Sequence, residues 1–272
     1  MSQPNTLAIE KLNRLIGTAA TPVLIDVRTD EDFAADPLLI PGSFRRIHKN
    51  VAEWAPVYKG RDVAVICHHG AKLSHGSAAW LRHAGVNAVS VEDGFEGWKA
   101  AGHPLVPVAK LPERDALGRT LWVTRARPKV DRIACPWLIR RFVDPSAVFL
   151  FVPSSEVEGV ASRFGATPFD IENTFWSHRG DTCTFDVMID EFGLAREPLL
   201  RLATIVRAAD TARLDLSPEA PGLLAASLGL SRIHSDDLAQ LDAGMSLYDA
   251  FYRWCRDATD ETHNWPSNKA KP

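Results

Sequence analysis

The chain has 272 residues, of which 46% are hydrophobic and 24% are charged, a composition typical of a globular protein with room for two domains. A net charge of −3 excludes nucleic-acid binding through bulk positive charge. Because no apolar run approaches the ~20 residues that span a bilayer and the N-terminus has no basic-then-apolar pattern, we expect neither a membrane anchor nor a secretory signal.

The four cysteines are widely spaced and include no CxxC pair, which argues against a zinc ribbon and a dithiol redox motif. Free thiols in a chain without a secretory signal fit a reducing compartment, so the predicted location is the cytoplasm. The cysteines are Cys67, Cys135, Cys183 and Cys255.

The first hundred residues alternate between strand and helix patterns. Strands are predicted over 23–28, 62–66 and 86–91, a helix starts near Ser74, and a second, short helix follows residue 91. This alternation predicts an α/β domain whose parallel sheet has helices on both faces.

Cys67 directly follows the second of these strands and opens a loop that ends near Ser74. Backbone N–H groups of such a loop, and the start of the next helix, favour negative charge on the sulfur. Lys72 adds a positive charge nearby. We therefore expect a thiolate, which is the nucleophilic form of cysteine.

Residues 5–107 resemble a rhodanese domain through four ordered segments, namely 24–28, 40–43, the loop at Cys67, and 93–105. The resemblance implies that Cys67 accepts sulfur from thiosulfate or a low-molecular-weight persulfide and passes it to a thiol or to cyanide, without a cofactor. It also assigns the binding of the charged sulfur to the active-site loop, which consists of His68, His69, Gly70, Ala71, Lys72 and Leu73.

The sequence differs from the family pattern at some positions, and the residues around Cys67 indicate which reaction and which roles are favoured. Leu73 stands where the phosphatase relatives of rhodanese need an arginine to clamp phosphate, so phosphatase activity is not favoured. Asp26 and Arg28, at the end of a strand, are expected to support the loop and not to react. His68 and His69 could act on the substrate, but shaping the mouth of the pocket is the favoured role.

Three prolines between residues 104 and 115 predict an extended linker. We therefore divide the chain into a rhodanese-like domain (5–107), a linker (108–118), a second domain (119–265) and a flexible tail (266–272).

The second half is predicted to be a mixed, helix-rich α+β domain. Strands are expected over 120–125 and 148–152, and the apolar run 185–189 is grouped with them. Asp131 is expected to cap a helix in which Pro136 lies near the first turn or causes a kink. Three further helices are expected over 197–212, 218–228 and 236–256.

This half resembles the C-terminal domain of the chromate-resistance (ChrB-type) family, most clearly over 122–142, 178–185 and 205–210. The resemblance implies a link to chromate resistance. Some members of that family regulate the resistance genes, but these carry a different N-terminal domain. A rhodanese-like domain in that position favours chemistry over transcriptional control.

Two groups of polar residues are candidate ligand sites in the second half. Nitrogen, oxygen and sulfur side chains that are close in sequence could bind a divalent metal, although a plain polar loop is the alternative. These residues are Glu172, His178, Asp181, Cys183 and Asp210. A basic segment could bind an oxyanion such as chromate, sulfate or phosphate, or could pair with nearby acids. Its residues are Arg125, Arg127, Lys129 and Arg132. Cys135 is interpreted as a core residue, with an acceptor thiol for the persulfide as the alternative.

The favoured function is a sulfurtransferase that works through a Cys67 persulfide and is linked to chromate resistance. The alternative is a chromate- or oxyanion-responsive sensor without sulfur-transfer turnover. A reductase ranks third because a single thiol would need an external reductant. No membrane partner is expected, and nucleic acid is not a favoured partner.

Overall fold

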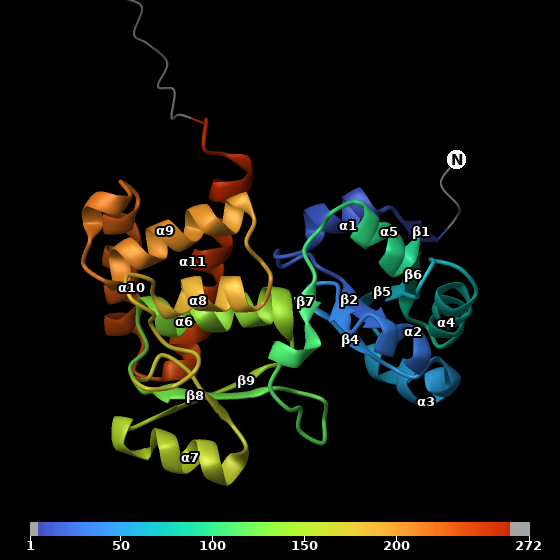
Figure 1. Ribbon diagram of the computed structural model, residues 1–272, viewed down its shortest axis with the longest axis horizontal. Helices are drawn as coiled ribbons and strands as arrows, with labels where there is room; N and C mark the ends of the chain where they lie inside the picture. Colours follow the sequence, from blue (N-terminus) through green and yellow to red (C-terminus); the bar gives the residue numbers. More distant parts are fainter. Residues whose placement is uncertain (1–4, 262–272) are drawn as a thin grey trace, which may run out of the picture.

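The computed structural model describes residues 5–261, and the predicted tail at 266–272 lies outside them. Two domains sit side by side, the N-terminal one in blue and teal and the C-terminal one in green to red (Figure 1). No helix in the described part of the chain is long and apolar enough to cross a membrane.

The N-terminal domain is built on a five-stranded, fully parallel sheet. Its strand order is β1 (Thr6–Leu7), β6 (Asn87–Val91), β5 (Asp62–Ile66), β2 (Val23–Asp26) and β4 (Ser43–Arg45). Central strands β2 and β5 are apolar on both faces, as expected for strands that helices cover on both sides.

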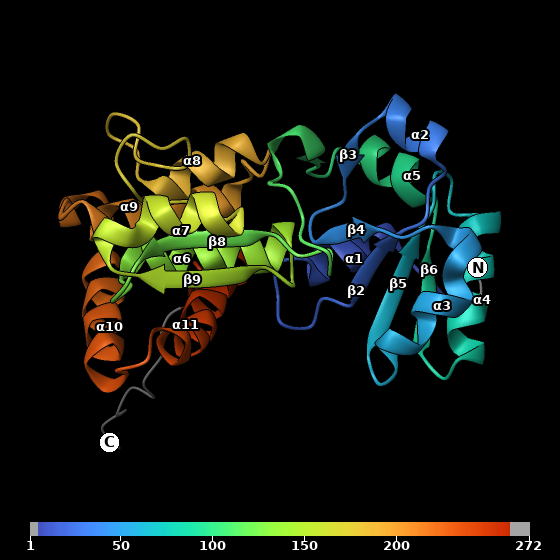
Figure 2. The same ribbon diagram turned by 90° about the horizontal axis from the view of Figure 1, so that it is seen from below.

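Helices cover both faces of this sheet, as the sequence predicted (Figure 2). Buried side chains of α1 (Ile9–Leu15) and α5 (Gly94–Ala100) pack on one face. Those of α3 (Val51–Trp54) and α4 (Lys72–His83) pack on the other. Thr29 caps the N-terminus of helix α2 (Asp30–Ala35), because its side chain accepts a hydrogen bond from Asp32 N.

The C-terminal domain is helix-rich around a small parallel sheet, in the order β10 (Thr167–Pro168), β8 (Leu121–Arg125) and β9 (Val148–Val152). Helix α7 (Val157–Phe164) packs below this sheet, and the other helices gather above it (Figure 1). They are α6 (Val130–Leu138), α8 (Thr184–Glu191), α9 (Glu197–Asp210), α10 (Ala220–Ile233) and α11 (Asp237–Asp257).

Two local predictions for this domain are wrong. The run 185–189 lies in helix α8 and not in a strand. Asp131 does not cap α6, because it is the second residue of that helix, after Lys129 at the cap position. Pro136 lies inside α6, which passes into a single π-helical turn over Ile139–Val143.

Part of the predicted linker has regular structure. Strand β7 (Val106–Pro107) pairs antiparallel with β3 (Leu38–Leu39), and a 3₁₀ turn over Val108–Lys110 follows. Lys110 forms an ion pair of 2.5 Å with Glu191 on α8, which also pairs with Arg179. The chain is therefore tied to both domains as it passes between them.

The two domains meet in a closely packed contact. Gly42 N donates a hydrogen bond of 2.6 Å to Phe142 O. Gly17 has a φ of +79°, and a Cβ there would lie 2.2 Å from Cζ of Phe142, so only glycine fits without a shift. Ile16 of the first domain and Phe142 and Tyr252 of the second belong to one continuous cluster of buried apolar residues.

Candidate functional site

Cys67 lies at the carboxyl end of β5 and is only 4% exposed. Its Sγ accepts a hydrogen bond of 3.2 Å from Ala71 N and lies 3.1 Å from Ser74 Oγ in the first turn of α4. Helix α4 begins at Lys72, two residues earlier than predicted. A backbone N–H and a helix N-terminus therefore face the sulfur, and both favour negative charge. The Ser74 hydroxyl also donates to Ala71 O at 3.1 Å.

The loop after Cys67 is fixed by its contact with the start of α5. Phe95 N donates to Cys67 O at 2.9 Å, and Glu96 N donates to His68 O at 3.0 Å. Gly94, with φ +60°, approaches so closely that a Cβ there would lie 2.2 Å from Cys67 O and 2.4 Å from Gly70 N. Glycine is needed at Gly94 because the two backbone segments touch.

Asp26 and Arg28 form a buried ion pair of 2.7 Å. The guanidinium also donates to the carbonyls of Asp36 and Leu38, and it stacks 3.8 Å from the ring centre of Phe95. Because Phe95 N donates to Cys67 O, the ion pair contacts the active-site loop through α5.

The two histidines after Cys67 lie against each other, with ring centres 4.3 Å apart. His68 Nδ1 is 3.9 Å from Glu96 Oε1, and His69 is exposed. This placement is compatible with the expected role at the mouth of the pocket.

A cavity of about 290 Å³ lies beside the loop. Three basic side chains, His48, Lys49 and Lys72, line it together with Trp80, and no acidic residue does. Leu73 also lines the cavity and packs on the apolar core. The cavity therefore suits a small anion, without the arginine that would clamp a phosphate.

In the second domain, carboxylates from three segments surround the imidazole of His178. Its Nε2 lies 3.4 Å from Asp170 Oδ1, 3.4 Å from Asp210 Oδ2 and 3.6 Å from Asp131 Oδ2. Donor atoms of Asp131, Asp170 and His178 all lie within 4.8 Å of one another, close enough to hold a metal ion. We call Asp131, Asp170, His178 and Asp210 the His178 cluster.

Electrostatic coupling is strong within the His178 cluster. Burial, reinforced by the charges of Asp210 and Asp170, raises the pKa of Asp131 well above its ordinary value. Burial also acts to raise the pKa of Asp170, but His178 and Arg132 outweigh it and the pKa falls. Interactions with Asp170 and Asp210 raise the pKa of His178 to about 10.

Only part of the predicted metal set lies in this cluster. Of that set, only His178 is among the donor atoms that all lie within 4.8 Å of one another. Asp210 adjoins them, with Oδ2 3.4 Å from His178 Nε2, whereas Glu172 and Asp181 are exposed. Cys183 is buried at the start of α8, and burial raises the pKa of its thiol, so the thiolate is disfavoured.

Sequence reasoning missed Asp131 and Asp170 as cluster members. A usable signal was present at Asp131, whose carboxylate lies on the same side of α6 as Ala134 and Cys135, three and four residues later and both buried. Asp170 follows the buried Phe169 and adopts a left-handed φ of +52°, which its sequence does not reveal.

The predicted oxyanion residues fall into two pairs, of which Arg127 and Lys129 line one cavity. Arg125 and Arg132 both pair with Asp170, at 3.4 and 3.3 Å. Arg127 donates to carbonyls at the end of α10, among them those of His234 and Ser231. Cys135 is fully buried, and burial raises the pKa of its thiol, as its core interpretation expects.

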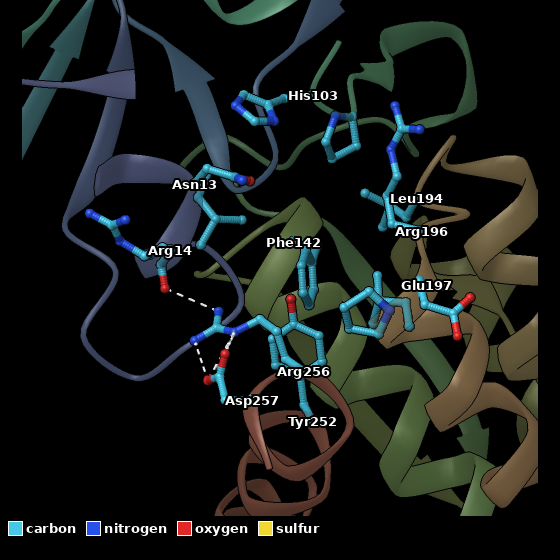
Figure 3. Close-up of a pocket in the computed structure, with 14 residues that line it drawn as sticks. Asn13, Arg14, His103, Phe142, Leu194, Arg196, Glu197, Tyr252, Arg256 and Asp257 are labelled. Carbon is cyan, nitrogen blue, oxygen red and sulfur yellow. Dashed lines mark hydrogen bonds and ion pairs between the residues drawn. The ribbon is translucent and has the colours of Figure 1, made fainter. Parts of the chain in front are cut away.

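A further cavity, of about 440 Å³, lies between the two domains (Figure 3). Arg256 crosses it to donate to Arg14 O at 3.0 Å, and it pairs with Asp257. Neither Cys67 nor His178 lines this cavity. It separates the two candidate sites and contains neither.

The parallel sheet, with a thiol at the end of a central strand and under a helix N-terminus, defines the N-terminal domain as a rhodanese-type fold. The rhodanese-like domain family matches residues 8–101, and the family described as ChrB, C-terminal domain, matches 122–255. The chain belongs to the rhodanese family, and its second half is a ChrB C-terminal domain.

Individual relatives match one half each. Thiosulfate sulfurtransferase GlpE of Actinobacillus succinogenes is 38% identical over 85 residues, which cover 30% of this chain and 74% of that protein. Protein ChrB of Cupriavidus metallidurans is 34% identical over 155 residues, 56% of this chain; the chain spans only 46% of that protein. The solved structure of a rhodanese-related protein from Thermoplasma volcanium is 24% identical, with a TM-score of 0.33 over 38% of this chain and 97% of that one.

Proposed function

We propose that the protein is a sulfurtransferase that carries sulfane sulfur as a Cys67 persulfide. The Cys67 thiolate attacks the outer sulfur of thiosulfate, the S–S bond breaks, and sulfite leaves with the bonding electron pair. An acceptor thiolate or cyanide then takes the outer sulfur and releases the Cys67 thiolate. Charge is conserved in both steps, and neither needs a cofactor.

The observation that supports this most directly is the environment of Sγ. Ala71 N–H donates to the sulfur at 3.2 Å and supports the thiolate that attacks the donor. Ser74 Oγ lies 3.1 Å from the sulfur and from Ala71 O, and its hydroxyl would have to turn from that carbonyl to donate to the thiolate. Similarity to a thiosulfate sulfurtransferase supports the same reaction class.

The adjoining cavity supports an anionic donor. Thiosulfate is a dianion, and Lys49 and Lys72 line a space of about 290 Å³. Cys67 is not among the lining residues, but Lys72 and Leu73 at the end of its loop are. Replacing both with glutamine is expected to raise KM for thiosulfate more than it lowers kcat, since the lysines bind the donor and do not react. A low-molecular-weight persulfide donor should be less affected, because its charge is smaller.

A direct test combines an activity assay with mass spectrometry. Incubation with thiosulfate should add one sulfur, about 32 Da, to the peptide that contains Cys67. Cys67→Ser should abolish both this adduct and thiocyanate formation from cyanide, whereas the control Cys255→Ser should retain both. Sulfur transfer that survives in Cys67→Ser would refute the proposal.

Similarity of the second half to a ChrB C-terminal domain supports a role of this activity in chromate resistance. One observation favours the alternative of an oxyanion sensor: Arg127, Lys129 and Arg232 line a cavity of about 520 Å³. A sensor of this kind would keep its chromate-dependent binding or oligomerisation in Cys67→Ser. If resistance instead depends on sulfur transfer, the same variant should lose it.

A further inference from the structure

We propose that the His178 cluster in the ChrB C-terminal domain binds one divalent transition-metal ion. Asp131, Asp170, His178 and Asp210 are its ligands. This site uses none of the residues of the sulfur-transfer reaction, so it stands or falls independently of the proposed function.

The three distances from the imidazole nitrogen to the carboxylate oxygens match those between ligand atoms around a four-coordinate ion. Around a metal with bonds of about 2.0–2.2 Å, neighbouring tetrahedral ligand atoms lie about 3.3–3.6 Å apart. His178 Nε2 lies 3.4, 3.4 and 3.6 Å from three carboxylate oxygens. An imidazole N–H can bond well with one acceptor at about 2.9 Å, not with three at these distances.

A buried oxygen without a partner gives an independent indication. Asp131 is 1% exposed, and its Oδ2 accepts a hydrogen bond of 2.7 Å from Thr184 N at the start of α8. Its Oδ1 is buried and has no hydrogen-bond partner within residues 5–261. Burying a carboxylate with an unsatisfied oxygen is unfavourable unless a proton neutralises it or a cation compensates it, and a bound cation would also give Oδ1 a partner.

Surrounding residues hold Asp170 in place, as outer contacts commonly do for metal-binding carboxylates. Thr184 Oγ1 donates to its Oδ1 at 3.1 Å, and the guanidinium groups of Arg125 and Arg132 lie 3.4 and 3.3 Å from its Oδ2. Asp170 is also held at a left-handed φ of +52°. Backbone strain of this kind concentrates at functional sites.

A metal ion can reach the His178 cluster from solvent, and the ligand types favour particular ions. Side-chain exposure of His178 is 39%, which leaves an entry path on that side. One imidazole and three carboxylates suit borderline ions such as Zn²⁺ or Mn²⁺, whereas a thiolate site would be softer. Donor oxygens of Asp131 and Asp170 would move closer together as the ion binds.

The test uses the full chain, stripped with a chelator and titrated with Zn²⁺ by calorimetry. One ion per chain is expected, with a higher melting temperature in its presence. His178→Ala and Asp210→Asn should each weaken Zn²⁺ binding by at least about 100-fold. Asp210 is chosen because it is less buried than Asp131, so Asp210→Asn is a second variant that should still fold if His178→Ala does not. Glu172→Gln and Asp181→Asn are matched controls that remove a nearby charge outside the cluster, and they should bind normally.

Co²⁺ provides a readout of the ligands themselves. Four-coordinate Co²⁺ with nitrogen and oxygen ligands gives strong visible absorption without a thiolate charge-transfer band. The proposal is overturned if the chain takes up no Zn²⁺, if His178→Ala and Asp210→Asn bind as well as the controls, or if Co²⁺ shows thiolate ligation. Loss of Zn²⁺ binding with intact sulfur transfer would separate this site from Cys67.

Discussion

Replacing Gly94 with alanine tests whether the contact between α5 and the Cys67 loop holds the active site. At this position φ is +60°, and an added Cβ would meet Cys67 O at 2.2 Å and Gly70 N at 2.4 Å. Both neighbours are backbone atoms, so the loop must move away. The two hydrogen bonds from the start of α5 to Cys67 O and His68 O are then lost or lengthened.

The expected size of the effect follows from two contributions. Left-handed backbone costs a non-glycine residue roughly 1–2 kcal/mol. Forcing extra atoms into a packed site costs about 1–3 kcal/mol more, for a total of about 2–5 kcal/mol. Gly60 is the matched control, because its φ is +79° and a Cβ there would meet nothing within 4 Å. Gly60→Ala should therefore show the backbone contribution alone.

The assay compares melting temperature and thiosulfate:cyanide sulfur transfer in the two variants. Gly94→Ala should melt below Gly60→Ala by about 2–4 °C for each kcal/mol of overpacking. Its kcat/KM should fall by about 100-fold, the scale expected when reacting groups are displaced by about 1 Å. Equal melting temperatures and full activity in Gly94→Ala would refute the idea that this close approach positions Cys67.

Three further changes probe separate features. Ser74→Ala removes the hydroxyl 3.1 Å from Cys67 Sγ and should lower kcat/KM about fivefold, the effect of ~1 kcal/mol; an unchanged rate would contradict its role. Gly17→Ala places a Cβ 2.2 Å from Phe142 Cζ and should speed proteolysis of the linker; cleavage at the wild-type rate would mean that the interface adapts. Hydrogen bonds from Lys110 and Arg179 lower the pKa of Glu191, so its stabilising effect is complete above the unfolded value of 4.5 and is lost as pH falls through the lower folded value. Glu191→Gln should therefore reduce stability by less than about 1 kcal/mol at pH 7 and by almost nothing in strong acid, and urea unfolding that shows the same difference at both pH values would contradict this.

Local signals were sufficient for the N-terminal domain. The sequence pattern of each element is local here, since the strand over 62–66, the loop at Cys67 and the next helix follow one another directly. In the structure, β5 and α4 lie close to the predicted bounds. An apolar run such as 185–189 carries no period that separates a buried strand from a buried helix, which is why it was misassigned.

The His178 cluster was only half predictable, because it forms from segments spread over residues 131–210. Asp131 at the start of a helix has the pattern of a cap, and only the position of α8 shows that its carboxylate instead caps that neighbouring helix. Likewise, charge alone could not show that Arg125 and Arg132 are engaged with Asp170.

The continuous apolar cluster that joins Ile16 to Phe142 and Tyr252 has a practical consequence. Cutting the chain between the two domains would expose part of this cluster to solvent on each fragment. Each fragment would then tend to self-associate through its exposed hydrophobic surface. If an isolated fragment were inactive, the cause could be the loss of its native packing. The result would not show which domain carries out the reaction. Point substitutions in the full chain are therefore the better way to separate the role of Cys67 from that of the His178 cluster.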